Sequence, residues 1–187
     1  MPAPNAPGDF DLTMDELREI TRYVAESAAQ VQDIFQRAHP EDPRVGAAID
    51  VAQEFIRGGP RNRRQRSASL EAHRAAKDAS TEAAWLAARA AGDAASAAYL
   101  HPIAKAHQVA HILRAAACAA RIAELNADDD PAAAGARAIE DATARATPVL
   151  VEVLSRYPAP PAGRNRVDQL MSALDTSLRA HRSPDPA

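Results

Sequence analysis

Alanine recurs through the middle of this chain in runs that single polar residues interrupt, as in the stretch AARAAG at 87–92. Alanine loses almost no side-chain entropy in a helix and leads the helix-propensity scale. No segment alternates β-branched residues between tight turns, as a strand would. The pattern therefore predicts helices whose backbones approach one another closely.

Apolar residues spaced three and four apart, preceded by capping residues, predict where the helices begin. Thr13 and Glu16 form a capping box. Asp42 followed by Pro43 is typical of a helix start, because Asp caps well and Pro fits the first turn. Pro148 should kink or split the helix that contains it. Seven segments share the pattern, at about 14–38, 43–57, 67–79, 82–99, 103–125, 131–154 and 167–178.

The length of 187 residues suits one domain. We predict an all-α, single-domain bundle of about seven helices with an alanine-rich centre. The bundle is expected to span 11–182, between a disordered N-terminus at 1–10 and a disordered tail at 183–187. Aromatic residues make up only 4% of the chain, so small side chains must supply much of the core.

Composition favours a cytoplasmic protein. A single cysteine excludes an internal disulfide framework and fits a reducing compartment. No uncharged apolar run reaches the roughly 18 residues of a membrane span, and we expect no secretory leader and no membrane contact. The net charge of −3 provides no overall field that would attract nucleic acid.

Candidate chemistry concentrates on the predicted helix at 103–125. His107, His111, Arg114 and Cys118 are spaced by four, three and four residues, so they fall within an arc of roughly 60°. The rest of this helix is mostly apolar, which is typical of an interior helix. The polar stripe should therefore face solvent through an opening or a polar cavity, and Cys118 should be a buried, inert thiol.

Three interpretations of the histidines remain open: a metal site, a polar pocket, or ordinary side chains that hydrogen-bond neighbouring helices. His107 and His111 are weak metal candidates, because two ligands do not make a zinc site and no HExxH pattern occurs. We predict no metal and no cofactor. The residues expected to line a pocket are His73, Arg89, Asp93, His101, His107, His111 and Arg114.

Arg89 and Asp93 lie one turn apart, and we first interpret them as an exposed pair that stabilises its helix by a few tenths of a kcal/mol. If this face turned toward the stripe, Arg89 would instead bind a carboxylate or phosphate through two hydrogen bonds. No GxSxG motif or glycine-rich phosphate loop is present. Catalytic residues therefore stay undefined.

The arginines at 57, 61, 63, 64 and 66 form the only basic cluster in the sequence. We expect Arg61 to Arg66 to be a solvated connector before the helix that begins near Ser67. Because the cluster lacks interleaved aromatic residues and a recognition helix, nucleic-acid binding is disfavoured.

Several short motifs resemble a bacterial family of putative immunity proteins of polymorphic-toxin systems. They are PEDPR at 40–44, AAID at 47–50, Gly58, Ala72-His73, AARAAG at 87–92, His101 and His107. The resemblance covers about residues 11–180. It implies an all-helical protein that binds and neutralises a cognate toxin in the cytoplasm of the producing cell.

The resemblance leaves an enzyme of specialised metabolism open, because the Arg61 to Arg66 cluster and His111 are not features carried over from the family pattern. Such an enzyme would use a His/Arg/Asp-lined cavity, with a histidine as general acid or base. The expected partner is thus a protein toxin or a small-molecule ligand. A homodimer is also open.

Overall fold

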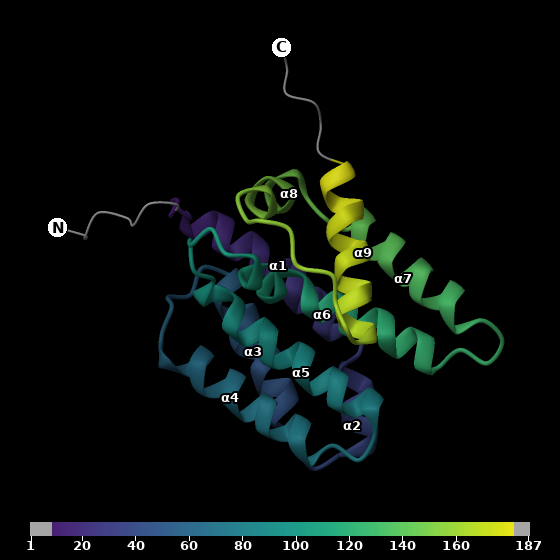
Figure 1. The fold of residues 1–187 in the computed structure, drawn as a ribbon. Coiled ribbons are helices and arrows are strands. Elements are labelled where there is room, and N and C mark those ends of the chain that lie inside the picture. Colours follow the sequence, from purple (N-terminus) through teal and green to yellow (C-terminus); the bar gives the residue numbers. More distant parts are fainter. Residues whose placement is uncertain (1–8, 182–187) are drawn as a thin grey trace.

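The computed structural model describes residues 9–181, and within them the protein is all-helical (Figure 1). The only β contact there is an isolated bridge between Asp9 and Ile103. The helices are α1 (Met14–Ala29), α2 (Gln32–Ala38), α3 (Arg44–Ile56), α4 (Arg63–Asp78), α5 (Glu82–Ser96), α6 (Val109–Leu125), α7 (Pro131–Ala144), α8 (Pro148–Ser155) and α9 (Arg166–Ala180), with short 3-10 helices η1 (Ala97–Tyr99) and η2 (Ala106–Gln108).

The prediction of the all-α class is confirmed, but the described residues form nine α-helices rather than about seven. The predicted helix at 14–38 is broken because Val31 has non-helical backbone angles. The break still lets Val31 and Phe35 turn into the core, where both are buried. Pro148 splits the sixth segment, as predicted, and starts α8 after the cap of Thr147.

Two predicted helix starts are wrong. The α4 helix begins at Arg63 rather than near Ser67, because Asn62 and Gln65 form a capping box at its N-terminus. Residues 63–66, four of the six residues of the supposed basic connector, are therefore helical. In contrast, α6 begins only at Val109, and the segment before it runs as a loop that ends in η2.

The α3 helix also starts one residue later than expected. Pro43 occupies the N-cap position and Arg44 begins the helix. The Asp42 carboxylate still accepts a hydrogen bond from the backbone N–H of Arg44, at 3.0 Å. The predicted capping arrangement is therefore wrong by one position: Pro43 is the N-cap, and Asp42, the residue before the cap, accepts this hydrogen bond.

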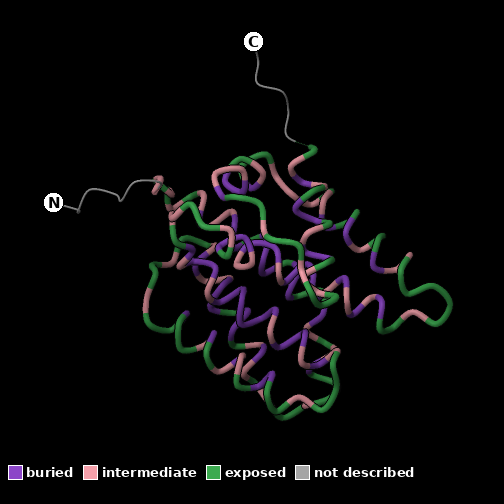
Figure 2. The backbone as a smooth tube through the Cα atoms, in the orientation of Figure 1, coloured by how far each residue is buried: buried purple, intermediate pink, exposed green. Residues whose placement is uncertain are grey.

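The α5 and α6 helices form the centre of the bundle. The α5 helix contacts α1, α2, α3, α4 and α6, while α6 contacts α1, α5, α7 and α9 (Figure 1). Alanines at 87, 88, 90, 91, 94 and 95 of α5 are fully buried. Because these side chains are small, neighbouring helices pack around α5 on nearly every side. Figure 2 shows this burial concentrated on the inner helices, with exposed residues on α4 and the loops.

The segments flanking the bundle attach to it through a few specific contacts. The backbone N–H of Phe10 donates to the carbonyl of Pro102 at 3.1 Å, and its ring meets Tyr157 edge-on. The remainder of the predicted disordered N-terminus, residues 1–8, and the tail at 182–187 lie outside the described residues. None of the described helices combines the length and the apolar composition needed to cross a bilayer.

Candidate functional site

The candidate site is built on an ion pair between the two central helices. Asp93 of α5 is only 1% exposed, and Arg114 of α6 reaches it with two nitrogens. Nε of Arg114 donates to Oδ2 at 2.8 Å, and Nη2 donates to Oδ1. A charge-assisted, bidentate pair of this kind fixes the relative orientation of its two side chains and is stronger than a single neutral hydrogen bond. It holds α5 and α6 in one register.

The predicted exposed pair between Arg89 and Asp93 is wrong. Asp93 is buried, and its partner comes from the polar stripe of α6 rather than from one turn away on α5. The Arg89 guanidinium instead lies over the ring of Trp85, at 5.1 Å from the ring centroid. Within the described residues Arg89 forms no ion pair and no side-chain hydrogen bond. The guanidinium of Arg89 is therefore available to an anion from outside the chain.

His73 of α4 approaches the ion pair from the other side. Its Nε2 lies 3.9 Å from Oδ1 of Asp93, which is too long for a hydrogen bond. The ring packs against Gly92, where an added Cβ would lie 2.7 Å from the nearest ring atom. Burial lowers the pKa of His73, and Asp93 offsets this only in part. The ring is therefore neutral at neutral pH.

His111 lies one turn before Arg114 on α6 and is also half-buried. Burial lowers its pKa, and the charge of Arg114 lowers it further, while Asp93 acts in the opposite direction. His101 and His107 are exposed at the edge of this cluster. Because α6 begins after His107, the predicted four-residue stripe exists only from His111 onward.

Cys118 completes the inner end of the stripe, and the expectation that its thiol is buried is confirmed. It is fully buried, and burial raises its pKa to about 12. A thiol with that pKa carries almost no thiolate at neutral pH. Among the described residues, no three His, Cys, Asp or Glu side chains come close enough together to hold a metal ion.

A partly open pocket of about 270 Å³ lies beside the ion pair, between α5, α6 and the start of α9. Arg89 and Arg114 line it, and α9 adds Arg166. Guanidinium groups suit carboxylate or phosphate ligands. The remaining lining residues are Glu82, Trp85, Asn165, Val167 and Asp168.

Only two of the seven predicted pocket residues, Arg89 and Arg114, line this pocket. Asp93 lies behind Arg114, while His73 and His111 surround the ion pair. The contribution of α9 could not be read from the sequence, because Arg166 is 52 residues away from Arg114. No local signal identifies such a neighbour.

Glu124 is a second buried acid that sequence reasoning missed. It is 4% exposed and accepts hydrogen bonds from Arg166 of α9, at 2.9 Å, and from Arg121, at 3.1 Å. The hydrogen bond from Arg166 is the main reason that the pKa of Glu124 lies below its usual range. Gly135 of α7 packs directly over this carboxylate. Glu124 therefore joins α6, α7 and α9 beside the pocket.

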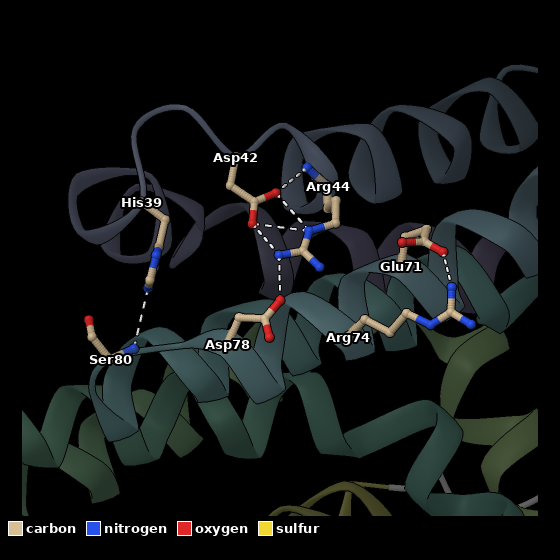
Figure 3. A network of polar contacts seen from close by, with 7 residues as sticks. All are labelled: His39, Asp42, Arg44, Glu71, Arg74, Asp78 and Ser80. Atoms are coloured by element: carbon tan, nitrogen blue, oxygen red, sulfur yellow. Dashed lines mark hydrogen bonds and ion pairs between the residues drawn. The ribbon is translucent and has the colours of Figure 1, made fainter.

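The PEDPR turn at 40–44 lies at the surface, unlike the buried pair of Asp93 and Arg114. Figure 3 shows Arg44 held by Asp42 and by Asp78 of α4, with Nη2 to Oδ2 distances of 2.6 and 2.8 Å. On the other side of the turn, the backbone N–H of Ser80 donates to Nε2 of His39 at 3.3 Å. The hydrogen bond with Arg44 lowers the pKa of Asp42. The turn is thereby fastened to the last residue of α4 and to the loop that follows it, and a shallow, open pocket of about 530 Å³ lies along the turn.

Comparison with known proteins locates the chain in one family. Neither the curated proteins nor the solved structures contain a match to this chain. A family model matches residues 11–147, which run from just before α1 to the residue before α8 and include both the surface turn and the buried ion pair. Since this match covers well over half of the chain, the protein belongs to the Imm-5 like putative immunity protein family.

Proposed function

We propose that this protein is an immunity protein that binds a cognate protein toxin and neutralises it inside the producing cell. The observation that carries the proposal is the family match over residues 11–147. Immunity by binding requires a preformed surface rather than a catalytic centre. Binding of this kind needs no cofactor or metal ion.

The rigidity of the surface turn supports this proposal. Arg44 is clamped between two carboxylates, Asp42 and Asp78, so the turn between α2 and α3 is held against α4 before any partner arrives. A surface that is already ordered loses less conformational entropy on binding. The ordered turn therefore supports a surface in the matched region that is formed before a partner binds.

Co-expression tests the proposal directly. Each toxin domain encoded beside this protein would be expressed in a sensitive host, with and without the full chain. We expect one toxin to stop growth alone, to be tolerated with the protein, and to co-purify with it from the cytoplasmic fraction. Tolerance of no toxin, together with no co-purification, would refute the proposed function.

Binding of a small anion is a second candidate, and the unpaired Arg89 in the α5–α6–α9 pocket favours it. Neither His111 nor Asp93 lines this pocket, so the candidate is the binding of an anion rather than a reaction. The pocket also depends on α9, which lies beyond the matched residues.

A thermal-shift titration separates this candidate from the first. Phosphate and citrate are the probes, and the expected result is a concentration-dependent rise in Tm for the wild type. The Arg89→Ala variant should lose that rise, and Arg137→Ala, on the exposed surface of α7, should keep it. An identical response of all three proteins would exclude anion binding by Arg89.

A further inference from the structure

Positive charge is concentrated on one segment of this acidic protein. Residues 57–78 contain seven arginines and lysines and only two acids, which makes the segment +5 while the whole chain is −3. The rest of the chain is therefore strongly negative. Figure 1 places the segment, which is mostly α4, at the outside of the bundle. A charge separation of this size creates an oriented field that steers an oppositely charged partner.

Four of these cations, Arg63, Arg66, Arg74 and Lys77, lie on the outer face of α4. At about 100° per residue, they share an arc of roughly 100° that points away from the buried side of the helix. The buried side is made of small residues such as Ala72 and Ala75, which pack toward α5. The outer face consists of exposed residues only: Arg63, Arg66, Ser67, Leu70, Arg74 and Lys77.

Leu70 stands in the middle of this outer face and is 53% exposed, more than any other large apolar side chain that the structure describes. Single exposed leucines are common on protein surfaces. Here, however, the leucine is surrounded by cations along the helix. An apolar centre with a charged rim is the usual anatomy of a protein–protein interface.

Neighbouring acids neutralise this face only in part. Arg74 pairs with Glu71 on the side of the helix (Figure 3), and Arg66 lies over the ring of Tyr99 at 4.3 Å. Arg63 and Lys77 form no ion pair and no side-chain hydrogen bond within residues 9–181. The two ends of the outer face therefore carry charges that no described group of this chain satisfies.

We propose that the outer face of α4 is the docking surface for the toxin, and that it binds an acidic surface of that partner with Leu70 inserted into an apolar pocket. This inference rests on the proposed function and names the surface that performs it. A protein partner is favoured over nucleic acid because Leu70 occupies the centre of the face. The face also exposes no aromatic side chain on which a base could stack.

Two charge-reversal variants test the proposal. Arg63→Glu/Lys77→Glu reverses both ends of the face, and Arg137→Glu/Arg164→Glu makes the same charge change on α7 and in the loop before α9. All four side chains are exposed and form no ion pair within the described residues, so both variants should melt as the wild type does. The Kd for the toxin that co-purifies would be measured at about 50 and about 300 mM salt.

The expected result is a Kd at least about 30-fold weaker for the α4 double variant at low salt, mainly through a slower association rate. The control double variant should bind within about twofold of the wild type. High salt should weaken toxin binding by the wild type and so reduce the difference in Kd between the wild type and the α4 double variant. Leu70→Ala should weaken binding by about tenfold and leave the salt dependence unchanged, because it removes an apolar contact and no charge.

Each other outcome overturns a distinct claim. Equal binding of the wild type and the α4 double variant would overturn the docking surface and leave the proposed immunity function standing. Absence of toxin binding by the wild type would refute the immunity function and the docking surface with it. Binding of a 20-base-pair DNA duplex that depends on Arg63 and Lys77, with toxin binding unaffected by them, would assign the face to nucleic acid instead.

Discussion

The α4 and α5 helices are neighbours of similar length, and alanine supplies much of the buried face of both, yet they have opposite roles. The α5 helix is surrounded by five other helices and buries ten residues, including the charged Asp93. The α4 helix packs against the bundle along one face and exposes its other face, which carries most of its cations. Alanine allows close packing in both helices, but the surroundings of each helix decide whether its charge stabilises the fold or remains free for a partner.

The sharpest way to break this comparison is to remove the buried charge of α5. Asp93→Ala leaves the guanidinium of Arg114 half-enclosed without a counter-ion, so we expect a loss of about 3–5 kcal/mol in the free energy of unfolding. Urea denaturation followed by circular dichroism measures it. A double variant, Asp93→Ala/Arg114→Met, should recover part of the loss, since it removes both charges. A loss under about 1 kcal/mol in the single variant would show that the pair is not structurally important.

A matched pair of leucine truncations compares the two helices directly. Leu86 of α5 is fully buried, whereas Leu70 of α4 is largely exposed. Leu86→Ala should destabilise the protein by about 2–5 kcal/mol because it leaves a cavity. Leu70→Ala should change stability by less than about 0.5 kcal/mol. Similar values for both variants in the same denaturation experiment would contradict the assignment of α4 as the outer helix.

The contact between the two helices is probed by Gly92→Ala. The new Cβ would collide with the ring of His73, but that side chain is 36% exposed and can rotate outward. Alanine also favours the helix by about 0.5–1 kcal/mol over glycine. We therefore expect a net change within about 1 kcal/mol and a displaced His73, which NMR of the imidazole ring would detect. A large destabilisation would mean that His73 cannot move.

The pH dependence of stability should be the smallest effect. The pKa values of His73 and His111 are lowered in the folded protein, so the unfolded chain binds more protons as the pH falls through the usual histidine range near 6.5. The histidines should therefore cost stability below that pH and nothing above it. Denaturation at about pH 7.5 and 5.5 measures the effect. His73→Gln/His111→Gln should reduce the pH dependence.

Much of the helical pattern was predictable because its signals are local. Thr13, Thr81 and Asp130 each cap the helix that follows, and their side chains accept hydrogen bonds from backbone groups three residues further on. The same chemistry at Asn62 was overlooked because the surrounding arginines suggested a connector. The extra helices arise from a break at Val31 and from a second break at Pro148. Only the break at the proline could be predicted from the sequence.

The candidate site was predicted only in part. Periodicity placed His111, Arg114 and Cys118 on one face of a helix, and the structure agrees. Periodicity could not reveal that Asp93 prefers Arg114, 21 residues away, to the nearby Arg89. It could not reveal that α9 closes the pocket with Arg166 either. Such pairings depend on the rotation and position of whole helices.

The sequence by itself determined the all-α class and most helix caps, because these properties depend on residues within one or two turns of one another. Only the tertiary structure decided which charges are buried and which stay exposed. The reason is that burying a charge is tolerable only where packing brings a partner to it. Packing supplied Arg114 to Asp93 in the interior of the bundle, and it left Arg63 and Lys77 on the surface without one.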